Sequence, residues 1–283
     1  MVSSLVIGSV GRRDKMPIAT VNGINIYYEV HGKGIPLIMT QGFAGNHKAW
    51  FFQTPVFKKY YKVIIFDSRG IGNSGTSDET YTIRTMAEDI IGLMDYLSIG
   101  NANVLGLSLG GLVAQEIAIS YPERVRKLVL GSTYTGRDVK NVHPELMDNL
   151  GIREGSTDID ISIIDFRKLI NFMVSASFNK RLFRMVFVPL SKYGLRSVDP
   201  EGYLRQMESV TGYDNLDRLQ LIKAPTLVIT GSEDRIISPD VSDLIASKIP
   251  NAVLVKVKGG SHAFFMEMRG RFNKEVLDFL RNR

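Results

Sequence analysis

The stretch of this chain that decides its fold is Val104-Leu105-Gly106-Leu107-Ser108-Leu109-Gly110-Gly111-Leu112. An apolar run of the kind found in buried strands leads directly into Gly-x-Ser-x-Gly, and a helical pattern follows without a loop. This context predicts a sharp turn that raises the hydroxyl of Ser108 above the sheet, with Gly106 and Gly110 leaving room for neighbouring backbone. The unpaired N–H groups at the start of the helix are expected to face a developing oxyanion. The stretch therefore predicts a nucleophilic serine; the alternative is a glycine-rich turn without chemistry.

The surrounding sequence repeats this alternation of short apolar runs and helical patterns. Such alternation is typical of a buried, mostly parallel sheet with helices on both faces. Before it, the Asn22-Gly23 pair between two β-rich segments predicts an antiparallel hairpin. The apolar runs predict strands at 36–40, 63–67, 102–106, 127–132, 225–231 and 252–257. With the hairpin, they predict an eight-stranded α/β sheet.

One long segment interrupts this pattern. Roughly ninety residues between Ser132 and Pro225 have helical spacing and no convincing strand, which is far longer than an ordinary connection. We therefore expect an insertion, which forms either a small second domain or, in the interpretation we adopt, a helical lid over the edge of the sheet. The expected division is an N-terminal extension at 1–16, a core at 17–136 and 215–283, and the lid at 137–214.

The expected lid contains more apolar residues than one amphipathic face needs. Phe166 and Met173 belong to one stripe, and Phe187 belongs to a second apolar patch. The excess predicts that these three residues contact the acyl part of a substrate. Packing of the lid on the sheet, or a dimer contact, is the alternative.

Composition excludes several classes of protein. The chain has no cysteine and only four histidines, so it cannot use a thiolate nucleophile or a disulfide, and we expect no metal or cofactor. The net charge is +6, but the basic residues are scattered, so we expect no nucleic-acid partner. No apolar run reaches the roughly 18 residues of a membrane span, and the N-terminus is a poor secretory signal. We expect a cytoplasmic monomer or homodimer that acts on a small molecule.

A serine hydroxyl needs a base to activate it and an acid to orient that base. On a strand–turn–helix fold the expected chain order is serine, acid, histidine, and only His262 satisfies this order. It follows the strand predicted at 252–257, and Asp234 follows the strand predicted at 225–231. The sequence therefore predicts a Ser108–Asp234–His262 triad. Glu233, beside Asp234, is the competing candidate for the acid.

A second glycine-rich segment imitates a nucleotide-binding motif. Gly70-Ile71-Gly72-Asn73-Ser74-Gly75 fits Gly-x-Gly-x-x-Gly, and Asp89 lies roughly twenty residues further on. In a dinucleotide site, however, the last glycine opens the helix directly. Here the polar stretch Thr76–Thr82 intervenes. We expect a tight structural loop beside the active site and no cofactor.

From about residue 17 onward the chain resembles the α/β-hydrolase superfamily. The resemblance is closest to the branch that holds esterases, cofactor-free bromoperoxidase-like enzymes, enol-lactonases and C–C bond hydrolases. The matching segments are Tyr27-Tyr28-Glu29-Val30-His31-Gly32, Gln41-Gly42-Phe43-Ala44-Gly45, Asp67–Gly75, Gly106–Gly111, Gly231–Asp234 and Gly260-Ser261-His262.

This resemblance implies an oxyanion hole made of two backbone N–H groups. One belongs to Leu109, after the nucleophile, and the other to Phe43, in the loop after the third strand. Gln41 stands where the family usually has histidine, and this departure puts the shape of the loop in question. We expect Gly42 to line the substrate site.

Together these features predict a carboxylesterase that cleaves short-to-medium acyl esters through an acyl-enzyme. Perhydrolysis, in which hydrogen peroxide replaces water, remains an alternative on the same triad, as do lactone cleavage and C–C bond cleavage. An alternative from a different class is a non-catalytic receptor for a small ligand.

Overall fold

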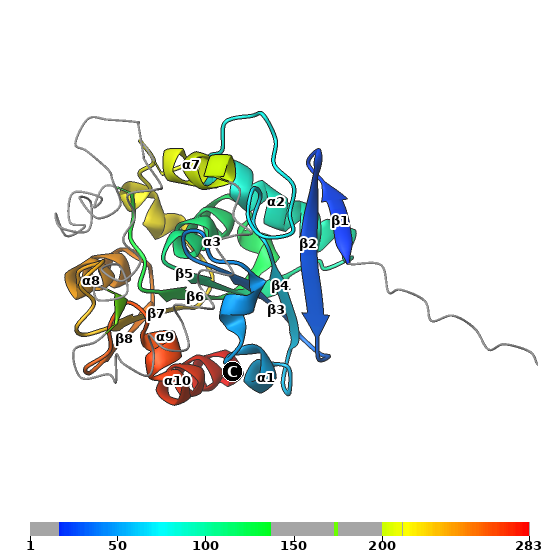
Figure 1. Ribbon diagram of the computed structural model, residues 1–283. Helices are drawn as coiled ribbons and strands as arrows, with labels where there is room; N and C mark the ends of the chain where they lie inside the picture. Colours follow the sequence, from blue (N-terminus) through cyan, green and yellow to red (C-terminus); the bar gives the residue numbers. More distant parts are fainter. Residues whose placement is uncertain (1–16, 137–172, 175–199, 211, 283) are drawn as a thin grey trace, which may run out of the picture.

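The computed structural model describes residues 17–136, 173–174, 200–210 and 212–282. In these residues, eight strands form one sheet in the order β1-β2-β4-β3-β5-β6-β7-β8 (Figure 1). β2 is antiparallel to both β1 and β4, and all other neighbours are parallel. The strands are β1 (Ile18–Val21), β2 (Ile24–His31), β3 (Pro36–Thr40), β4 (Lys62–Phe66), β5 (Ala102–Leu107), β6 (Val125–Gly131), β7 (Thr226–Gly231) and β8 (Val253–Val257). The predicted eight-stranded, mostly parallel sheet is confirmed.

The hairpin that opens the sheet has the predicted turn. Asn22 and Gly23 have φ angles of 47° and 77°, and a type I′ turn requires positive φ at both central positions. The turn pairs Val21 with Ile24, so β1 and β2 begin their ladder directly beside it. The antiparallel β2 then pairs with β4 and joins the hairpin to the parallel strands.

Helices cover both faces of the sheet (Figure 1). The longer ones are α2 (Ile83–Tyr96), α3 (Leu109–Ser120), α7 (Pro200–Glu208), α8 (Pro239–Lys248) and α10 (Arg269–Arg281). The shorter turns are η1 (His47–Trp50), α1 (Thr54–Phe57), η2 (Pro122–Arg124), η5 (Leu216–Leu221) and α9 (Phe264–Glu267). Two helices begin at side-chain caps, since Thr82 accepts from the N–H of Thr85 and Ser238 from that of Asp240. No described helix is long and apolar enough to cross a membrane.

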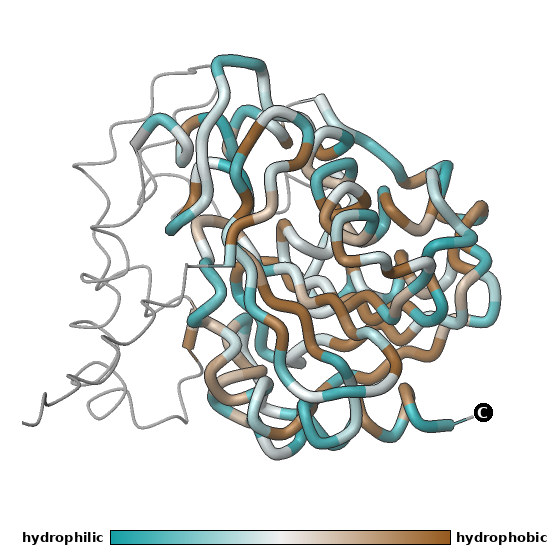
Figure 2. Tube along the Cα trace, turned by 90° about the vertical axis from the view of Figure 1, so that its right-hand side faces the viewer, coloured by the Kyte–Doolittle hydropathy of each residue, from teal (hydrophilic) through white to brown (hydrophobic). Residues whose placement is uncertain are grey.

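The core lies in two layers because side chains alternate along each strand. In β3, Ile38 belongs to the core layer that also contains residues of α2, α3 and α8, whereas Leu37 and Met39 belong to the other layer, with residues of α1 and α10. β5 repeats this alternation with Val104 in the first layer and Leu105 in the second. Figure 2 shows the resulting hydrophobic strands enclosed by more hydrophilic segments. Such burial on both faces explains why these strands appear in the sequence as continuous apolar runs.

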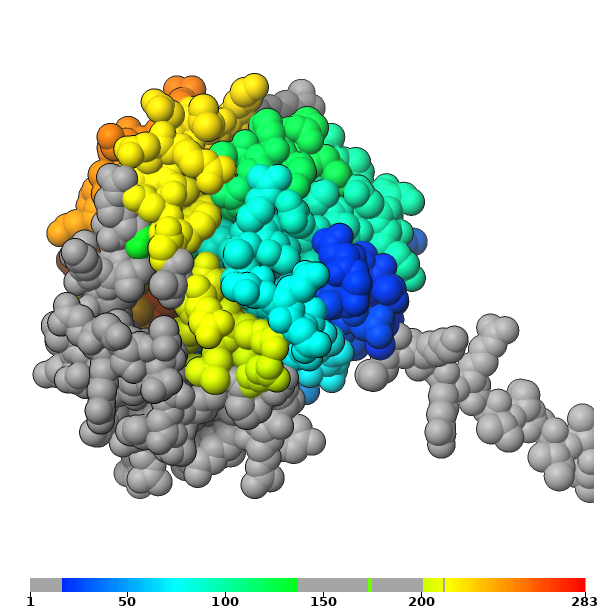
Figure 3. Space-filling model, turned by 90° about the horizontal axis from the view of Figure 1, so that it is seen from above, coloured from blue at the N-terminus to red at the C-terminus, as the bar shows by residue number. Residues whose placement is uncertain are grey.

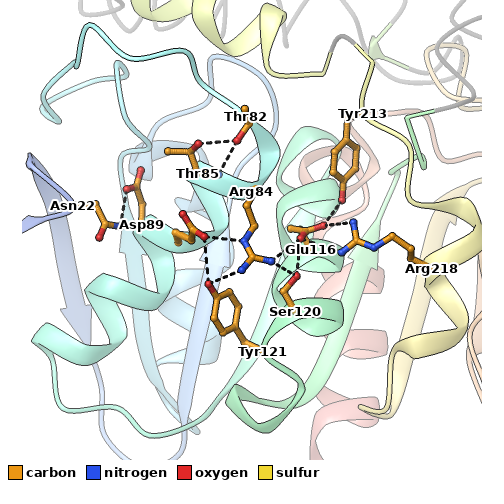
Figure 4. A network of polar contacts seen from close by, with 11 residues as sticks. Asn22, Thr82, Arg84, Thr85, Asp89, Glu116, Ser120, Tyr121, Tyr213 and Arg218 are labelled. Atoms are coloured by element: carbon orange, nitrogen blue, oxygen red, sulfur yellow. Dashed lines mark hydrogen bonds and ion pairs between the residues drawn. The ribbon is translucent and has the colours of Figure 1, made fainter.

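The segments that flank the expected lid are both held on α3. The N–H of Asn215 donates to the carbonyl of Thr135 at 3.1 Å, and its side-chain amide donates to Gln115 of α3 at 2.9 Å. Beside it, the buried carboxylate of Glu116 accepts from Tyr213 and Arg218 (Figure 4). These contacts bring the segments before and after the insertion to one helix.

Most of the expected lid lies outside the described residues, apart from Met173, Val174 and the segment that contains α7. α7 lies above the edge where the parallel strands end (Figure 1). Seen from above, it lies beside the loop that follows β4 (Figure 3). This contact is tight, because a Cβ atom on Gly202 of α7 would lie 2.2 Å from the carbonyl oxygen of Gly70. The described part of the insertion therefore packs directly on the edge where the catalytic residues are expected.

Candidate active site

Ser108 occupies a strained turn between a strand and a helix. β5 ends at Leu107 and α3 begins at Leu109, so the turn consists of Ser108 alone. Its φ of 51° and ψ of −121° are unusual for a residue with a side chain. Its N–H donates to the carbonyl of Gly131 at 2.9 Å, and its carbonyl accepts from Gly111 at 2.8 Å. Such strain persists only where the surroundings impose it, and it is common at active sites.

The flanking glycines are required by close backbone packing. A Cβ atom on Gly106 would lie 2.3 Å from the carbonyl oxygen of Gly110. One on Gly110 would lie 2.5 Å from the carbonyl oxygens of both Thr40 and Gln41. The turn can therefore form only with glycine at both positions, as the sequence pattern predicts.

His262 and Asp234 form a hydrogen-bonded pair at the same edge of the sheet. Nδ1 of His262 lies 2.8 Å from Oδ2 of Asp234. The second carboxylate oxygen, Oδ1, accepts from the N–H groups of Ile236 and Ile237, both at 2.9 Å. Asp234 is 5% exposed and His262 is 8% exposed, whereas Glu233 is exposed. Of the two carboxylates considered from the sequence, Asp234 is the one bonded to the histidine.

The loop after β3 lies against the serine. A Cβ atom on Gly42 would lie 3.1 Å from the Cβ atom of Ser108. In this loop the N–H of Gly42 donates to Oε1 of Gln41, and that of Gly45 donates to the carbonyl of Gly42. The N–H of Ala44 donates to Oε1 of Gln206 in α7.

One N–H group of this loop, that of Phe43, has no acceptor within the part of the chain that the structure describes. The same holds there for the N–H of Leu109 at the start of α3. These are the two groups that the family resemblance assigns to the oxyanion hole.

The three residues expected to contact the acyl group are only partly described. Phe166 and Phe187 lie outside the described residues. Met173 is half-buried, and its carbonyl accepts from the N–H of Ala263 at 2.9 Å and from Oγ of Ser261 at 2.6 Å. Because these two residues flank His262, the main chain at Met173 contacts the histidine loop directly. Whether its side chain contacts a substrate remains a prediction.

A second histidine–aspartate pair, His47 and Asp67, was not predicted from the sequence. Nδ1 of His47 lies 2.7 Å from Oδ1 of Asp67, and its Nε2 lies 3.6 Å from Oε1 of Glu29. Both ring nitrogens of His47 therefore face carboxylates. The other Asp67 oxygen accepts from the N–H of Asn73, so this pair holds together the loops after β3 and β4. His47, Asp67 and Glu29 come from three separate segments, and no local motif marks them.

The glycine-rich segment after β4 is a compact loop, as expected from the sequence. A Cβ atom on Gly72 would lie 2.3 Å from the carboxylate of Asp67, so this turn closes on its own side chains. Asp89 is bonded to Arg69 through both carboxylate oxygens at 2.6 Å. Asp89, the acid that a dinucleotide site would use, is therefore already paired with Arg69. Across the described ranges, no cluster of three or more histidine, aspartate and glutamate side chains is arranged to hold a metal ion.

Comparison with known proteins agrees with this geometry. A family model described as the alpha/beta hydrolase fold matches residues 35–268. A protein of Azorhizobium caulinodans, provisionally named carbamate hydrolase RutD, is 26% identical over 266 residues that cover 93% of this chain and 98% of the relative.

Two solved structures are similar over nearly their whole length. The enol-lactonase from Burkholderia xenovorans LB400 has a TM-score of 0.82 and 26% identity, covering 94% of this chain and 100% of that chain. Est816, described as an N-acyl homoserine lactone degrading enzyme, has a TM-score of 0.80 and 28% identity, and the match covers 93% of this chain and 100% of that chain. The sheet order, the turn at Ser108 and the matched residues lead to one conclusion: the chain belongs to the α/β-hydrolase family.

Proposed function

We propose that the protein hydrolyses carboxylic esters through a Ser108–His262–Asp234 triad. In the first step Oγ of Ser108 attacks the ester carbonyl while Nε2 of His262 takes the hydroxyl proton. The negative charge that develops on the carbonyl oxygen is stabilised by the N–H groups of Phe43 and Leu109. The proton on His262 then passes to the leaving alcohol, and an acyl-enzyme remains on Ser108.

The second step reverses these roles. Nε2 of His262 takes a proton from water, whose oxygen attacks the acyl carbon of the ester formed on Ser108. When the tetrahedral intermediate collapses, the proton returns to Oγ and the carboxylic acid leaves. Throughout both steps, Asp234 holds the histidine ring by accepting from its Nδ1–H.

The strained turn at Ser108, with the N–H groups of Phe43 and Leu109 lacking an acceptor among the described residues, is the observation that supports the proposal most directly. A positive φ at a residue that bears a side chain costs roughly 1–3 kcal/mol unless the fold compensates. Gly106 and Gly110 make this conformation accessible, and the Gly42 loop lies against the serine. A purely structural strand–helix turn does not need this strain.

The test is hydrolysis of a series of p-nitrophenyl esters combined with labelling by a fluorophosphonate. We expect the wild-type protein to prefer short-to-medium acyl chains over acetate, and Ser108→Ala to abolish both turnover and labelling. Ser132→Ala is the matched control, because Ser132 is a buried serine with positive φ at the end of the neighbouring β6. Persistent labelling of Ser108→Ala, or equal loss in both variants, would disprove the assignment.

A lactone, which is a cyclic carboxylic ester, is the second candidate substrate. It is favoured because two similar structures are described as lactone-cleaving enzymes. The same triad suffices, since ring opening leaves the alcohol attached to the acyl-enzyme. Comparing kcat/KM for a γ-lactone with that for a linear ester of equal carbon number decides between the two.

A further inference from the structure

We infer that Gln206, on helix α7, is a positioning residue for the oxyanion hole. This inference rests on the proposed function and adds to it a residue outside the triad and the loop. The contact is a hydrogen bond of 3.1 Å from the N–H of Ala44 to Oε1 of Gln206, two residues separated by 162 positions. Gln206 is 2% exposed, so water competes little for this bond.

The bond acts at the strained position of the loop. Ala44 has a φ of 54°, in the region that residues with a side chain rarely adopt. Because peptide units are rigid, the plane that carries the Ala44 N–H also carries the Phe43 carbonyl. Fixing this plane limits rotation of Phe43, whose own N–H is the proposed oxyanion donor. Gln206 thereby holds the donor's direction without contacting the substrate.

Two further contacts fix α7 relative to this loop. The ring of Tyr203, one turn before Gln206, lies edge-to-face on Phe43 with centroids 4.5 Å apart. On the same helix, Gly202 approaches Gly70 so closely that neither position has space for a Cβ atom. Tyr203 is 5% exposed, and its burial raises the pKa of its hydroxyl, which therefore stays neutral. α7 is thus packed on two loops at this edge of the sheet. This packing keeps the side-chain amide of Gln206 opposite the N–H of Ala44.

Satisfying the neighbouring N–H groups also leaves one donor for the substrate. Gly42, Ala44 and Gly45 each donate within the protein, to Gln41, Gln206 and Gly42 respectively. Without the acceptor on Gln206, the Ala44 N–H would be unsatisfied near the site, and the loop could rotate to pair it. Such a rotation would turn Phe43 away from the oxyanion and weaken transition-state binding more than substrate binding.

The experiment compares Gln206→Met with Gln115→Met. Both replace a buried glutamine by an apolar residue of similar length, but Gln115 bonds Asn215 and the carbonyl of Tyr134, away from the oxyanion loop. For each variant the measurements are kcat and KM for a p-nitrophenyl ester, the dissociation constant of an alkyl trifluoromethyl ketone, and Tm. The ketone forms an adduct on the nucleophilic serine and places its oxyanion in the hole.

We expect Gln206→Met to lower kcat and to weaken ketone binding by about tenfold or more, with KM within about twofold of wild type. Gln115→Met should leave kcat and ketone affinity unchanged while lowering Tm. If Gln206→Met does not fold, Gln206→Asn, whose amide is one methylene too short to reach Ala44, takes its place with the same expectations.

Two results would overturn the inference. The first is a Gln206 variant with kcat and ketone affinity within twofold of wild type. The second is parallel loss of both quantities in the Gln206 and Gln115 variants. A wild-type protein that neither hydrolyses esters nor binds the ketone would overturn the proposed function itself, and the inference with it.

Discussion

At the scale of single residues, Asp234 is distinguished from its neighbour by what its two oxygens contact. One oxygen lies 2.8 Å from Nδ1 of His262 and the other accepts two backbone N–H groups. Glu233 projects from the same loop but is exposed. Chain order and the ends of the predicted strands located the acid of the triad to Glu233 or Asp234. Only the folded loop shows which of these two adjacent carboxylates is bonded to the histidine.

This difference makes a direct prediction. Asp234→Asn should lower kcat by roughly 10³–10⁴-fold, because an amide no longer stabilises the imidazolium or selects the required tautomer. The measurement is steady-state hydrolysis of a p-nitrophenyl ester. Glu233→Gln, the adjacent control, should keep kcat within about twofold of wild type. The reverse ranking would move the acid to Glu233.

The glycines of the turn give a second prediction. Gly110→Ala should lower the free energy of unfolding by roughly 1–3 kcal/mol, because its Cβ atom would clash with two carbonyl oxygens at 2.5 Å. Gly270→Ala is the control, since Gly270 lies in α10 and a Cβ atom there meets nothing within 4 Å. That variant should be neutral or up to about 1 kcal/mol more stable. Urea unfolding measures both, and equal stability of the two variants would contradict the packing described here.

At the scale of helices and strands, the sequence predicted those elements that are long enough to show a recognisable pattern of apolar residues. The predicted strand at 36–40 has the bounds found for β3, and the helix expected directly after Ser108 begins at Leu109 as α3. The strand predicted at 63–67 lies one residue earlier in the structure, as β4. Helix α1 escaped prediction because four residues are too short to show helical periodicity.

The buried carboxylate of Glu116, on α3, is expected to make stability depend on pH. Hydrogen bonds from Ser120, Arg218 and Tyr213 hold the pKa of Glu116 below its usual value, although burial acts in the opposite direction. This carboxylate therefore stabilises the fold above the pKa of an unfolded glutamate, about 4.3, and the stabilisation is lost as pH falls through the lower folded value. Glu116→Gln should lower the unfolding free energy by about 2 kcal/mol at pH 7 and by less at acidic pH.

The control for this network is Glu88→Gln. Glu88 bonds the same Arg84 as Glu116 does, but both members of that pair are nearly half exposed. Such surface pairs contribute only about 0.3–0.5 kcal/mol. Urea unfolding from pH 3 to pH 8 measures both variants. A constant difference between Glu116→Gln and wild type across this range would contradict the role of the carboxylate.

At the scale of the whole molecule, the fold was predictable because the parallel strands end at one edge of the sheet, and those inside the sheet, β3 to β7, are largely buried on both faces. Ser108, Asp234 and His262 each follow one of these parallel strands, so their convergence could be inferred from their order in the chain. The contact between Gln206 and Ala44 could not, because the two residues are separated by 162 positions and no local sequence pattern links them. The pair of His47 and Asp67 was hidden for a similar reason, since its partners come from separate loops.

Acid quenching during turnover shows directly whether an acyl group resides on Ser108, as the proposed mechanism requires. The protein is mixed with p-nitrophenyl butyrate, quenched within the first turnover, digested and analysed by mass spectrometry. We expect a burst of one p-nitrophenol per chain and one butyryl group on the peptide that contains Ser108. A butyryl group on another residue, or a burst that survives Ser108→Ala, would contradict it.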